Sequence, residues 1–289
     1  MGNRTRYAHD GITQNLVQIQ TAGLPQNKTA WAREAGNIQN EGEYYLFVGC
    51  LPYFDTLFRE IGGRPLGTAS NMIKILNRLG IEPVVSDEER CCGHDMLWNG
   101  NVDLFKELAA FNIDLIKRCG SKKVIFSCPE GYMTFKKYYP LYFPELDFEV
   151  VHLFELLAQQ LADGGVQLDS VDRSVTYQDP CRLGRMAGIY EAPREIIAAI
   201  PGMKLEEMEN SGENAICCGV SCWANCNSYS KQIQIDRLKE AKVTGADLLI
   251  TACPKCNIHF KCALSSNDME IEVQELTDVI ALAMGCVSV

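Results

Sequence analysis

The sequence lacks the features that would place it in a membrane or give it a nucleotide cofactor of its own. No apolar run approaches the roughly 20 residues that a membrane-spanning helix needs, and the best candidate, residues 279–289, is short. Residues 1–20 mix Arg, His, Asp, Asn and Gln and contain no apolar core typical of a secretory signal. Because no Gly-x-Gly-x-x-Gly motif follows a predicted strand, we expect no flavin or nicotinamide on this chain. We predict a cytoplasmic protein with no membrane span.

Positive charge is in deficit as well. The chain has 27 Lys and Arg residues against 37 Asp and Glu residues, which gives a formal net charge of -10 at pH 7. Because such a field repels phosphates, we predict no nucleic-acid partner. The 47% hydrophobic and 22% charged residues are typical of a globular protein, and 289 residues suffice for one large domain or two domains of ordinary size.

Cysteine, by contrast, is abundant, with 14 residues. Disulfides do not persist in a reducing compartment, so ligation of a metal or an iron-sulfur cluster is the leading explanation. Most of the cysteines fall into two copies of a Cys...Cys-Cys-Gly...Cys pattern at a nearly constant offset, which indicates an internal duplication. The first copy comprises Cys50, Cys91, Cys92 and Cys128, and the second comprises Cys181, Cys217, Cys218, Cys253 and Cys256.

The segments around these motifs alternate between strand and helix. Short apolar strands are predicted at residues 44–48, 124–126, 174–177 and 247–251, and each of them leads into a cysteine of the pattern. Capping and stop residues predict helices at 68–79, 101–119 and 228–243, with another beginning near residue 193. We also predict a strand at 81–85 and a helix at 151–161. The cysteines would thus follow the carboxyl ends of strands, where open α/β sheets build their sites.

We therefore predict an α/β fold with two pseudo-symmetric strand-helix lobes of Rossmann-like type, each carrying one Cys-Cys-Gly cluster motif. Residues 44–168 would form the first lobe and residues 169–289 the second. Residues 1–43 are polar and show little apolar periodicity, so they are predicted to form an extended arm outside the core. We expect this arm to help hold a partner that docks near the lobe interface.

The five cysteines of the second copy exceed the four ligands that a tetrahedral zinc ion accepts. Thiolates are soft donors that both zinc and iron-sulfur clusters bind, and Cys-x-x-Cys presents two sulfurs on one turn. The consecutive pair Cys217-Cys218 requires a sharp turn, which Gly219 can supply. The pattern favours an iron-sulfur cluster over structural zinc or buried free thiols.

These motifs resemble the Cys-Cys-Gly (CCG) domain of the B-type subunit of heterodisulfide reductase and its relatives, over about residues 44–264. In that family the pattern occurs twice, and a five-cysteine copy holds a noncubane [4Fe-4S] cluster. The resemblance implies that the second lobe holds such a cluster. The first copy departs from the pattern, because Gly131 stands where the fifth cysteine belongs. Its four cysteines leave open a second iron-sulfur cluster of another type, or an altered or empty site.

Two residues beside the motifs are candidate catalytic residues. His94, directly after Cys91-Cys92-Gly93, can donate to a cluster sulfur or protonate a substrate thiolate, or it can be a plain loop residue. Lys255, within Cys-Pro-Lys-Cys, can offset the charge of a cluster and raise its potential, or it can be solvated. Cys222 and Cys226 follow Cys218 at intervals of four and can line the cluster pocket as buried thiols, with an added ligand or a reactive thiol as the alternative. The remaining cysteines are predicted to pack ordinarily: Cys119, Cys262 and Cys286.

The resemblance implies one of two functions. The first is an iron-sulfur subunit of a heterodisulfide-reductase-like complex, which takes electrons from a ferredoxin-like subunit and reduces or oxidises a small disulfide or thiol substrate at the noncubane cluster. The alternative is a non-catalytic subunit that transfers electrons between a ferredoxin-type protein and a flavin-linked dehydrogenase, with a flavoprotein subunit as partner. A zinc-stabilised interaction module is a third and weaker interpretation. Family resemblance does not fix the substrate.

Overall fold

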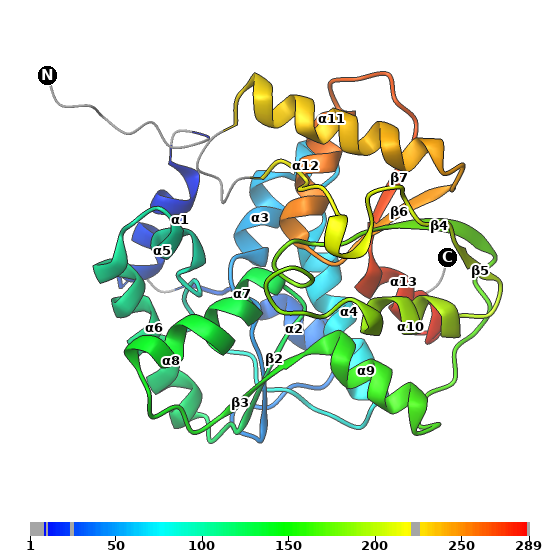
Figure 1. Ribbon diagram of the computed structural model, residues 1–289. Coiled ribbons are helices and arrows are strands. Elements are labelled where there is room, and N and C mark those ends of the chain that lie inside the picture. The colour runs from blue at the N-terminus through cyan, green and yellow to red at the C-terminus, as the bar shows by residue number, and fades with distance from the viewer. Residues whose placement is uncertain (1–8, 10, 24–25, 221–225, 288–289) are drawn as a thin grey trace, which may run out of the picture.

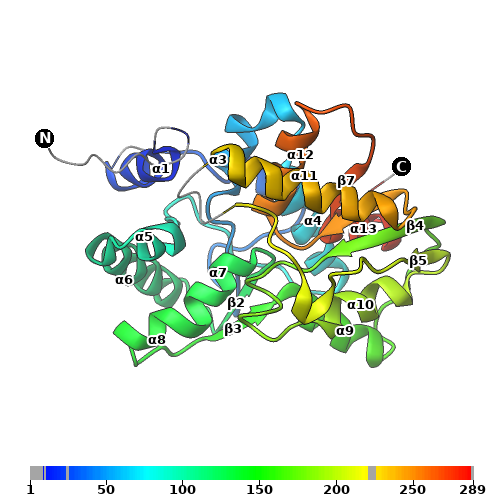
Figure 2. The same ribbon diagram turned by 45° about the horizontal axis from the view of Figure 1, so that its top comes forward.

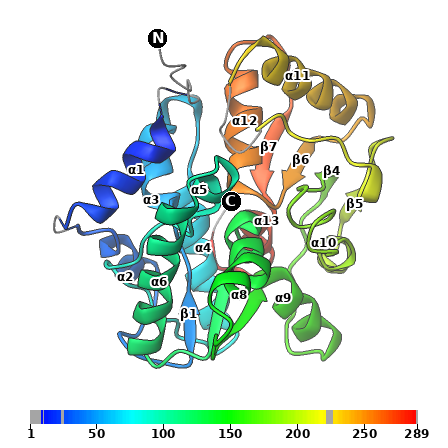
Figure 3. The same cartoon turned by 60° about the vertical axis from the view of Figure 1, so that its left-hand side comes forward.

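Short parallel strands form two sheets, one in each half of the chain, in the computed structural model shown in Figure 1. The structure describes residues 9, 11–23, 26–220 and 226–287. The strand order is β1-β2-β3 in the first sheet and β5-β4-β6-β7 in the second, as Figure 3 shows for the second sheet. The strands are β1 (Tyr44–Leu46), β2 (Lys123–Phe126), β3 (Glu149–His152), β4 (Arg173–Gln178), β5 (Met203–Leu205), β6 (Leu248–Thr251) and β7 (Glu272–Glu275).

The register of the two sheets confirms the predicted α/β fold with two pseudo-symmetric lobes. In the first sheet Tyr45 lies opposite Val124, and in the second Val175 lies opposite Leu248. β1, β2 and β3 therefore correspond to β4, β6 and β7 in order of pairing. The central strand β6 is buried along its whole length, as expected for a parallel strand that is covered on both faces.

Helices connect the strands and cover both sheets. Asn101 caps α6 as predicted, since its side chain accepts a hydrogen bond from the Leu104 amide at 3.3 Å, and α11 has the predicted bounds. In the described part of the chain, no helix is long and apolar enough to cross a membrane. The helices are α1 (Ile12–Thr21), α2 (Ala30–Ala35), α3 (Leu51–Leu57), α4 (Pro65–Arg78), α5 (His94–Trp98), α6 (Val102–Arg118), α7 (Pro129–Met133), α8 (Tyr139–Tyr142), α9 (Leu153–Ala162), α10 (Glu191–Ala199), α11 (Ser228–Val243), α12 (Pro254–Leu264) and α13 (Leu276–Ala283).

The two lobes share one hydrophobic core. α4 of the first lobe packs against α13 of the second, and α9 packs against α10, as Figures 1 and 2 show. Leu76, Leu153, Ile197 and Ile280 from these helices belong to a single buried cluster. Asp278 on α13 adds polar contacts by accepting hydrogen bonds from side chains of α4. This shared core fixes one set of cysteine motifs relative to the other.

Several predicted elements differ from the structure. The predicted helix at 68–79 begins earlier, at Pro65, because proline fits the first position of a helix, and the predicted strand at 44–48 ends at Leu46. The predicted strand at 81–85 is not formed; Val84 makes only isolated parallel bridges, because Pro83 has no amide to extend the ladder. The predicted helix at 151–161 begins too early, since its first two residues end β3. His152 then caps α9, with Nδ1 accepting from the Phe154 amide at 3.3 Å.

The described part of the N-terminal segment is not an extended arm. Residues 12–21 and 30–35 form α1 and α2, and Leu16, Val17 and Ala32 are buried in the cores of the lobes. Polar residues on the outer faces of these short helices concealed the few apolar contacts that hold them in place. The segment therefore belongs to the folded body.

Candidate functional site

The cysteines follow the carboxyl ends of equivalent strands in the two lobes. Cys128 follows β2 and stands at the N-cap of α7, while Cys253 follows β6 and stands at the N-cap of α12. In both helices proline occupies the first position, where a missing amide costs no hydrogen bond. Cys50 similarly precedes α3 after β1, and Cys181 follows β4. The cysteines therefore lie at the carboxyl ends of the strands, as predicted.

Each Cys-Cys pair turns at a glycine that no other residue can replace without strain. Gly93 has φ 82° and Gly219 has φ 80°, in the left-handed region. A Cβ atom on Gly93 would lie 2.8 Å from the Phe105 ring, and one on Gly219 would lie 2.7 Å from the Ser230 carbonyl oxygen. The Gly93 amide donates to the Cys91 sulfur at 3.4 Å, and the Gly219 amide likewise donates to Cys217. The glycine thus bends the chain and supplies a hydrogen bond to the first sulfur of the pair.

The five second-lobe cysteines form a continuous group of thiols. The sulfur atoms of Cys256 and Cys218 are 2.9 Å apart, and thiol-thiol hydrogen bonds join Cys181 to Cys217, Cys217 to Cys218 and Cys253 to Cys256. Hydrogen bonds from Cys181 and Cys218 lower the pKa of Cys217 to about 2, and the same contact raises the pKa of Cys181. None of these cysteines forms a disulfide. The donor set fits an iron-sulfur cluster and exceeds the needs of zinc.

The first-lobe cysteines also converge, but with four thiols. All four line one small pocket, and Cys50 and Cys92 both hydrogen-bond to Cys91, which lowers the pKa of Cys91. Gly131 lies on α7 where Cys256 lies on α12. A Cβ atom on Gly131 would meet the Phe126 ring at 3.0 Å. The first group of cysteines therefore differs from the second in two ways: it lacks the fifth cysteine, and an aromatic ring packs against the position where that cysteine would stand.

A buried charge cluster joins the two sites. The Lys255 ammonium lies 2.7 and 2.8 Å from the Asp95 carboxylate oxygens and 2.6 Å from Glu130 Oε2. Burial lowers the pKa of Lys255, but the two carboxylates outweigh this effect and raise it well above its ordinary value. Burial raises the pKa of Asp95, yet Lys255 and His94 bring it down to about 2. The ammonium occupies the position between Asp95 and Glu130 that a metal cation would take, and its charge is shared by the two carboxylates.

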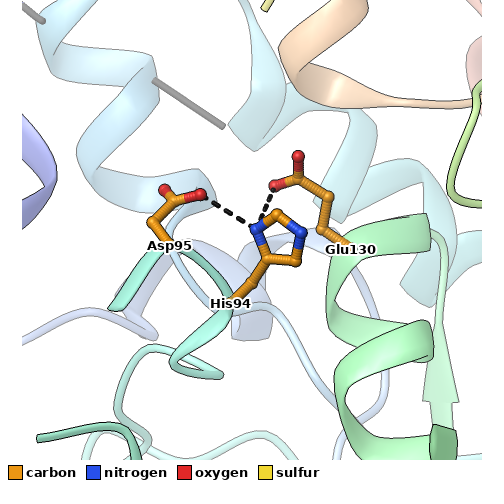
Figure 4. A group of neighbouring side chains, drawn as sticks. All are labelled: His94, Asp95 and Glu130. Atoms are coloured by element: carbon orange, nitrogen blue, oxygen red, sulfur yellow. Dashed lines mark hydrogen bonds and ion pairs between the residues drawn. The ribbon is translucent and has the colours of Figure 1, made fainter. Parts of the chain in front are cut away.

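His94 lies in the same cluster and has an identifiable tautomer. Figure 4 shows its Nδ1 facing both carboxylates, at 2.9 Å from Asp95 and 3.4 Å from Glu130. Its Nε2 faces the Nε of Arg182 at 3.2 Å. Because an arginine nitrogen can only donate, His94 accepts at Nε2 and carries its proton on Nδ1. Arg182 directly follows Cys181, so His94 connects the first-lobe Cys-Cys-Gly turn to a second-lobe motif cysteine.

The sequence alone pointed to His94 and Lys255, whose catalytic roles stay predictions, but it did not point to their partners Asp95, Glu130 and Arg182. The alignment of the two copies contains one available signal, since Glu130 in Cys-Pro-Glu-Gly occupies the place of Lys255 in Cys-Pro-Lys-Cys. Opposite charges at equivalent positions of a duplicated motif indicate pairing across the pseudo-symmetry axis. Lys255 is buried and is not a solvated lysine.

The other cysteines occupy varied positions. Cys119 is buried in the first-lobe core, Cys286 packs at the edge of the shared core, and Cys262 accepts a hydrogen bond from the Lys231 ammonium at 3.2 Å. Cys226 is exposed. Cys222 lies outside the described residues, so its predicted place beside the cluster pocket stays a prediction.

Comparison with known proteins defines the class to which this site belongs. The CCG cysteine-rich domain family matches residues 44–136 and 175–261, which contain both sets of cysteines, and the chain belongs to this family. A crystal structure of a hypothetical protein from Helicobacter pylori has a similar fold, with a TM-score of 0.60 and 14% identity over 94% of this chain and 54% of that chain.

Among characterised relatives, the chain is 33% identical to the D-type subunit of the dihydromethanophenazine:CoB--CoM heterodisulfide reductase of Methanosarcina acetivorans, over 90% of this chain and 63% of that protein. It is 31% identical to "EtfAB:quinone oxidoreductase" of Syntrophomonas wolfei, over 75% of this chain and 30% of that protein. It is 29% identical to "Probable iron-sulfur-binding oxidoreductase FadF" of Bacillus subtilis, over 90% of this chain and 36% of that protein. The chain thus spans less than two thirds of each relative.

These similarities correct one detail of the predicted resemblance. They support the CCG domain and the D-type subunit of heterodisulfide reductase, and they do not support the B-type subunit specifically. These relatives are a heterodisulfide reductase subunit and two oxidoreductases, one of them named as iron-sulfur-binding, which supports iron-sulfur binding and a redox role for this chain.

Proposed function

We propose that this chain is the iron-sulfur subunit of a heterodisulfide-reductase-like complex in the reducing cytoplasm. It would receive electrons from a ferredoxin-type partner and reduce, or in the reverse direction oxidise, a disulfide or thiol substrate at a noncubane [4Fe-4S] cluster. The observation that carries the proposal is the continuous group of five thiols in the second lobe. Zinc would leave part of this group unused, whereas a multinuclear cluster uses all of it.

Cys181, Cys217, Cys218, Cys253 and Cys256 would hold this cluster, and Cys50, Cys91, Cys92 and Cys128 would hold a second iron-sulfur cluster. When bound, the clusters supply one-electron redox chemistry. Reduction of one disulfide to two thiols consumes two electrons, which the ferredoxin-type partner provides, and two protons.

The residues between the two sites fit the proton requirement. We propose His94 as the proton donor to the substrate thiolate. In this role the ring would take up a proton at Nε2, in place of the contact with Arg182, and pass that proton on, while its Nδ1 proton stays on the carboxylates. Lys255 is held by two carboxylates, which makes it a poor proton donor. We assign Lys255 the role of holding the two ligand loops together and balancing the negative charge of the thiolates.

The decisive experiment is metal analysis of protein purified without oxygen. Iron, acid-labile sulfide and the electron paramagnetic resonance (EPR) spectrum are measured for the wild type, Cys91→Ser and Cys217→Ser. We expect iron and sulfide in the wild type and loss of a different EPR signal in each variant. Zinc without sulfide would overturn the proposal. Iron that depends on Cys217 alone would leave the first lobe without a cluster and favour the second function below.

The second candidate function is electron transfer without catalysis, between a ferredoxin-type protein and a flavin-linked dehydrogenase. The Phe126 ring packed against Gly131 favours it, because the first lobe cannot match the five-ligand site of the second. The relative named EtfAB:quinone oxidoreductase supports a flavoprotein partner. Turnover of a small disulfide by the isolated chain with an artificial electron donor would distinguish catalysis from relay.

A further inference from the structure

The N-terminal helix α1 reaches the first-lobe ligand pair directly. The side-chain oxygen of Gln20 accepts a hydrogen bond from the Cys91 amide at 2.7 Å. Both residues are buried, with exposed fractions of 7% and 6%, although they are far apart in sequence. The matched CCG range begins only at residue 44, so this contact comes from outside the matched domain.

The Cys91-Cys92 turn needs such partners. Residues 89–92 belong to no helix or strand, so their buried peptide groups lack the hydrogen-bond partners that regular structure supplies. Asn112 on α6 donates to the Cys91 carbonyl at 3.1 Å, and the Tyr139 hydroxyl donates to the Cys92 carbonyl at 3.1 Å. Gln20 and Asn112 therefore hold both the N–H group and the C=O group of Cys91.

The segment that carries Gln20 is itself anchored beside the first-lobe cysteines. Leu16 and Val17 on α1 are buried. Beyond α1, Gln26 hydrogen-bonds the Tyr53 hydroxyl on α3, the helix that follows Cys50, and Lys28 donates to the Glu89 carbonyl just before Cys91. Two of the first-lobe ligand loops are thus tied to the same N-terminal segment.

We propose that Gln20 is a positioning residue for the first-lobe cluster, and that α1 is a built part of that site. Gln20 fixes the peptide of Cys91 and so sets the direction of its sulfur, which also accepts from the Gly93 amide. Partners of ligand groups fix ligand orientation and tune metal affinity. This inference rests on the proposed function, because it requires a cluster in the first lobe.

The test compares Gln20→Met, which keeps the length and removes the acceptor, with Gln20→Glu, which keeps an acceptor oxygen. Val17→Ala is the matched control, since it weakens the packing of α1 and leaves the hydrogen bond. Each full-length protein is purified without oxygen, and the EPR spectrum and the rate of iron release to a chelator are measured. The Cys91→Ser and Cys217→Ser variants assign the signals to the two lobes.

We expect Gln20→Met to change the first-lobe signal and to speed release of first-lobe iron about tenfold, while the second-lobe signal stays as in the wild type. Gln20→Glu should restore the first-lobe line shape. An unchanged first-lobe signal in Gln20→Met, or the same change in Val17→Ala, would overturn the assignment and leave the proposed function intact. Wild-type protein with iron in the second lobe alone would defeat this inference and the proposed first-lobe cluster together.

Discussion

Glu130 and Lys255 occupy the same position in the two copies of the cysteine motif and form a buried ion pair at 2.6 Å. Each residue directly follows the proline of a Cys-Pro step at the start of a helix, α7 in one lobe and α12 in the other. The two copies of the motif therefore carry opposite charges at equivalent positions, and these positions lie in contact with each other. Asp95 adds a second carboxylate to the same ammonium.

We expect Lys255→Met to destabilise the protein by about 3–5 kcal/mol, because it leaves two buried carboxylates without their cation. Combining Lys255→Met with Glu130→Gln should cost less than the sum of the two single changes, since the double variant removes one of the stranded charges. Anaerobic urea unfolding of the four proteins measures this coupling. Lys239→Met is the control, because its ion pair with Asp236 is exposed and should contribute little. Strict additivity would contradict the inferred ion pair.

Replacing the motif glycines should remove iron from one lobe at a time. Gly93→Ala places a Cβ against the Phe105 ring, and Gly219→Ala places one against the Ser230 carbonyl oxygen. We expect Gly93→Ala to lower first-lobe iron and Gly219→Ala to lower second-lobe iron, as measured by iron content and EPR.

Gly245→Ala is the control that distinguishes the effect of backbone strain from the effect of a Cβ clash in the Gly93 and Gly219 variants. Gly245 also has a positive φ, 76°, but nothing lies within 4 Å of its Cβ position. It should lose about 1 kcal/mol of stability and keep its iron. Equal iron loss in all three variants would show that strain alone accounts for the effect.

Adding the missing fifth cysteine should fail unless space is made for it. Gly131→Cys alone forces the Phe126 ring to move, whereas Gly131→Cys with Phe126→Leu leaves room for the new side chain. We expect the double variant to give a first-lobe EPR signal similar to that of the second lobe, and the single variant to bind less iron. Phe126→Leu alone is the control for the lost ring, and it should cost about 1 kcal/mol. A five-ligand signal from the single variant would show that the ring yields easily.

Stability should fall in mild acid through His152. Burial lowers the pKa of His152 to about 3, from 6.5 in an accessible histidine. The unfolded chain therefore binds this proton first as the pH falls, so stability is complete above pH 6.5 and is lost progressively toward pH 3. Between pH 7.5 and 5.5 the loss from this residue should be about 1.4 kcal/mol.

The His152→Gln variant should not show the loss of unfolding free energy between pH 7.5 and 5.5 that His152 contributes in the wild type. Urea unfolding of the wild type and of His152→Gln at both pH values isolates it, because all other titrating groups are common to the two proteins. Parallel pH profiles would mean that His152 can take up a proton without unfolding.

The sequence by itself determined the local features of both sites. Duplicated spacing, strand ends before cysteines and a glycine after each pair are local patterns, and short-range backbone geometry enforces them. The same spacing exposed the first-lobe departure at Gly131. Helices with clear caps, such as α6 and α11, were predicted nearly to their ends.

Only the tertiary structure decided what lies between and around the two sites. The contact of Gln20 with Cys91 and the pairing of Lys255 with Asp95 and Glu130 join segments that are distant in the chain. Such contacts depend on how α4, α9, α10 and α13 pack the two lobes together. The hydrophobic periodicity of a single segment does not predict that arrangement. Burial then gives these pairs their strength, because charges and peptide groups removed from water must find partners within the protein.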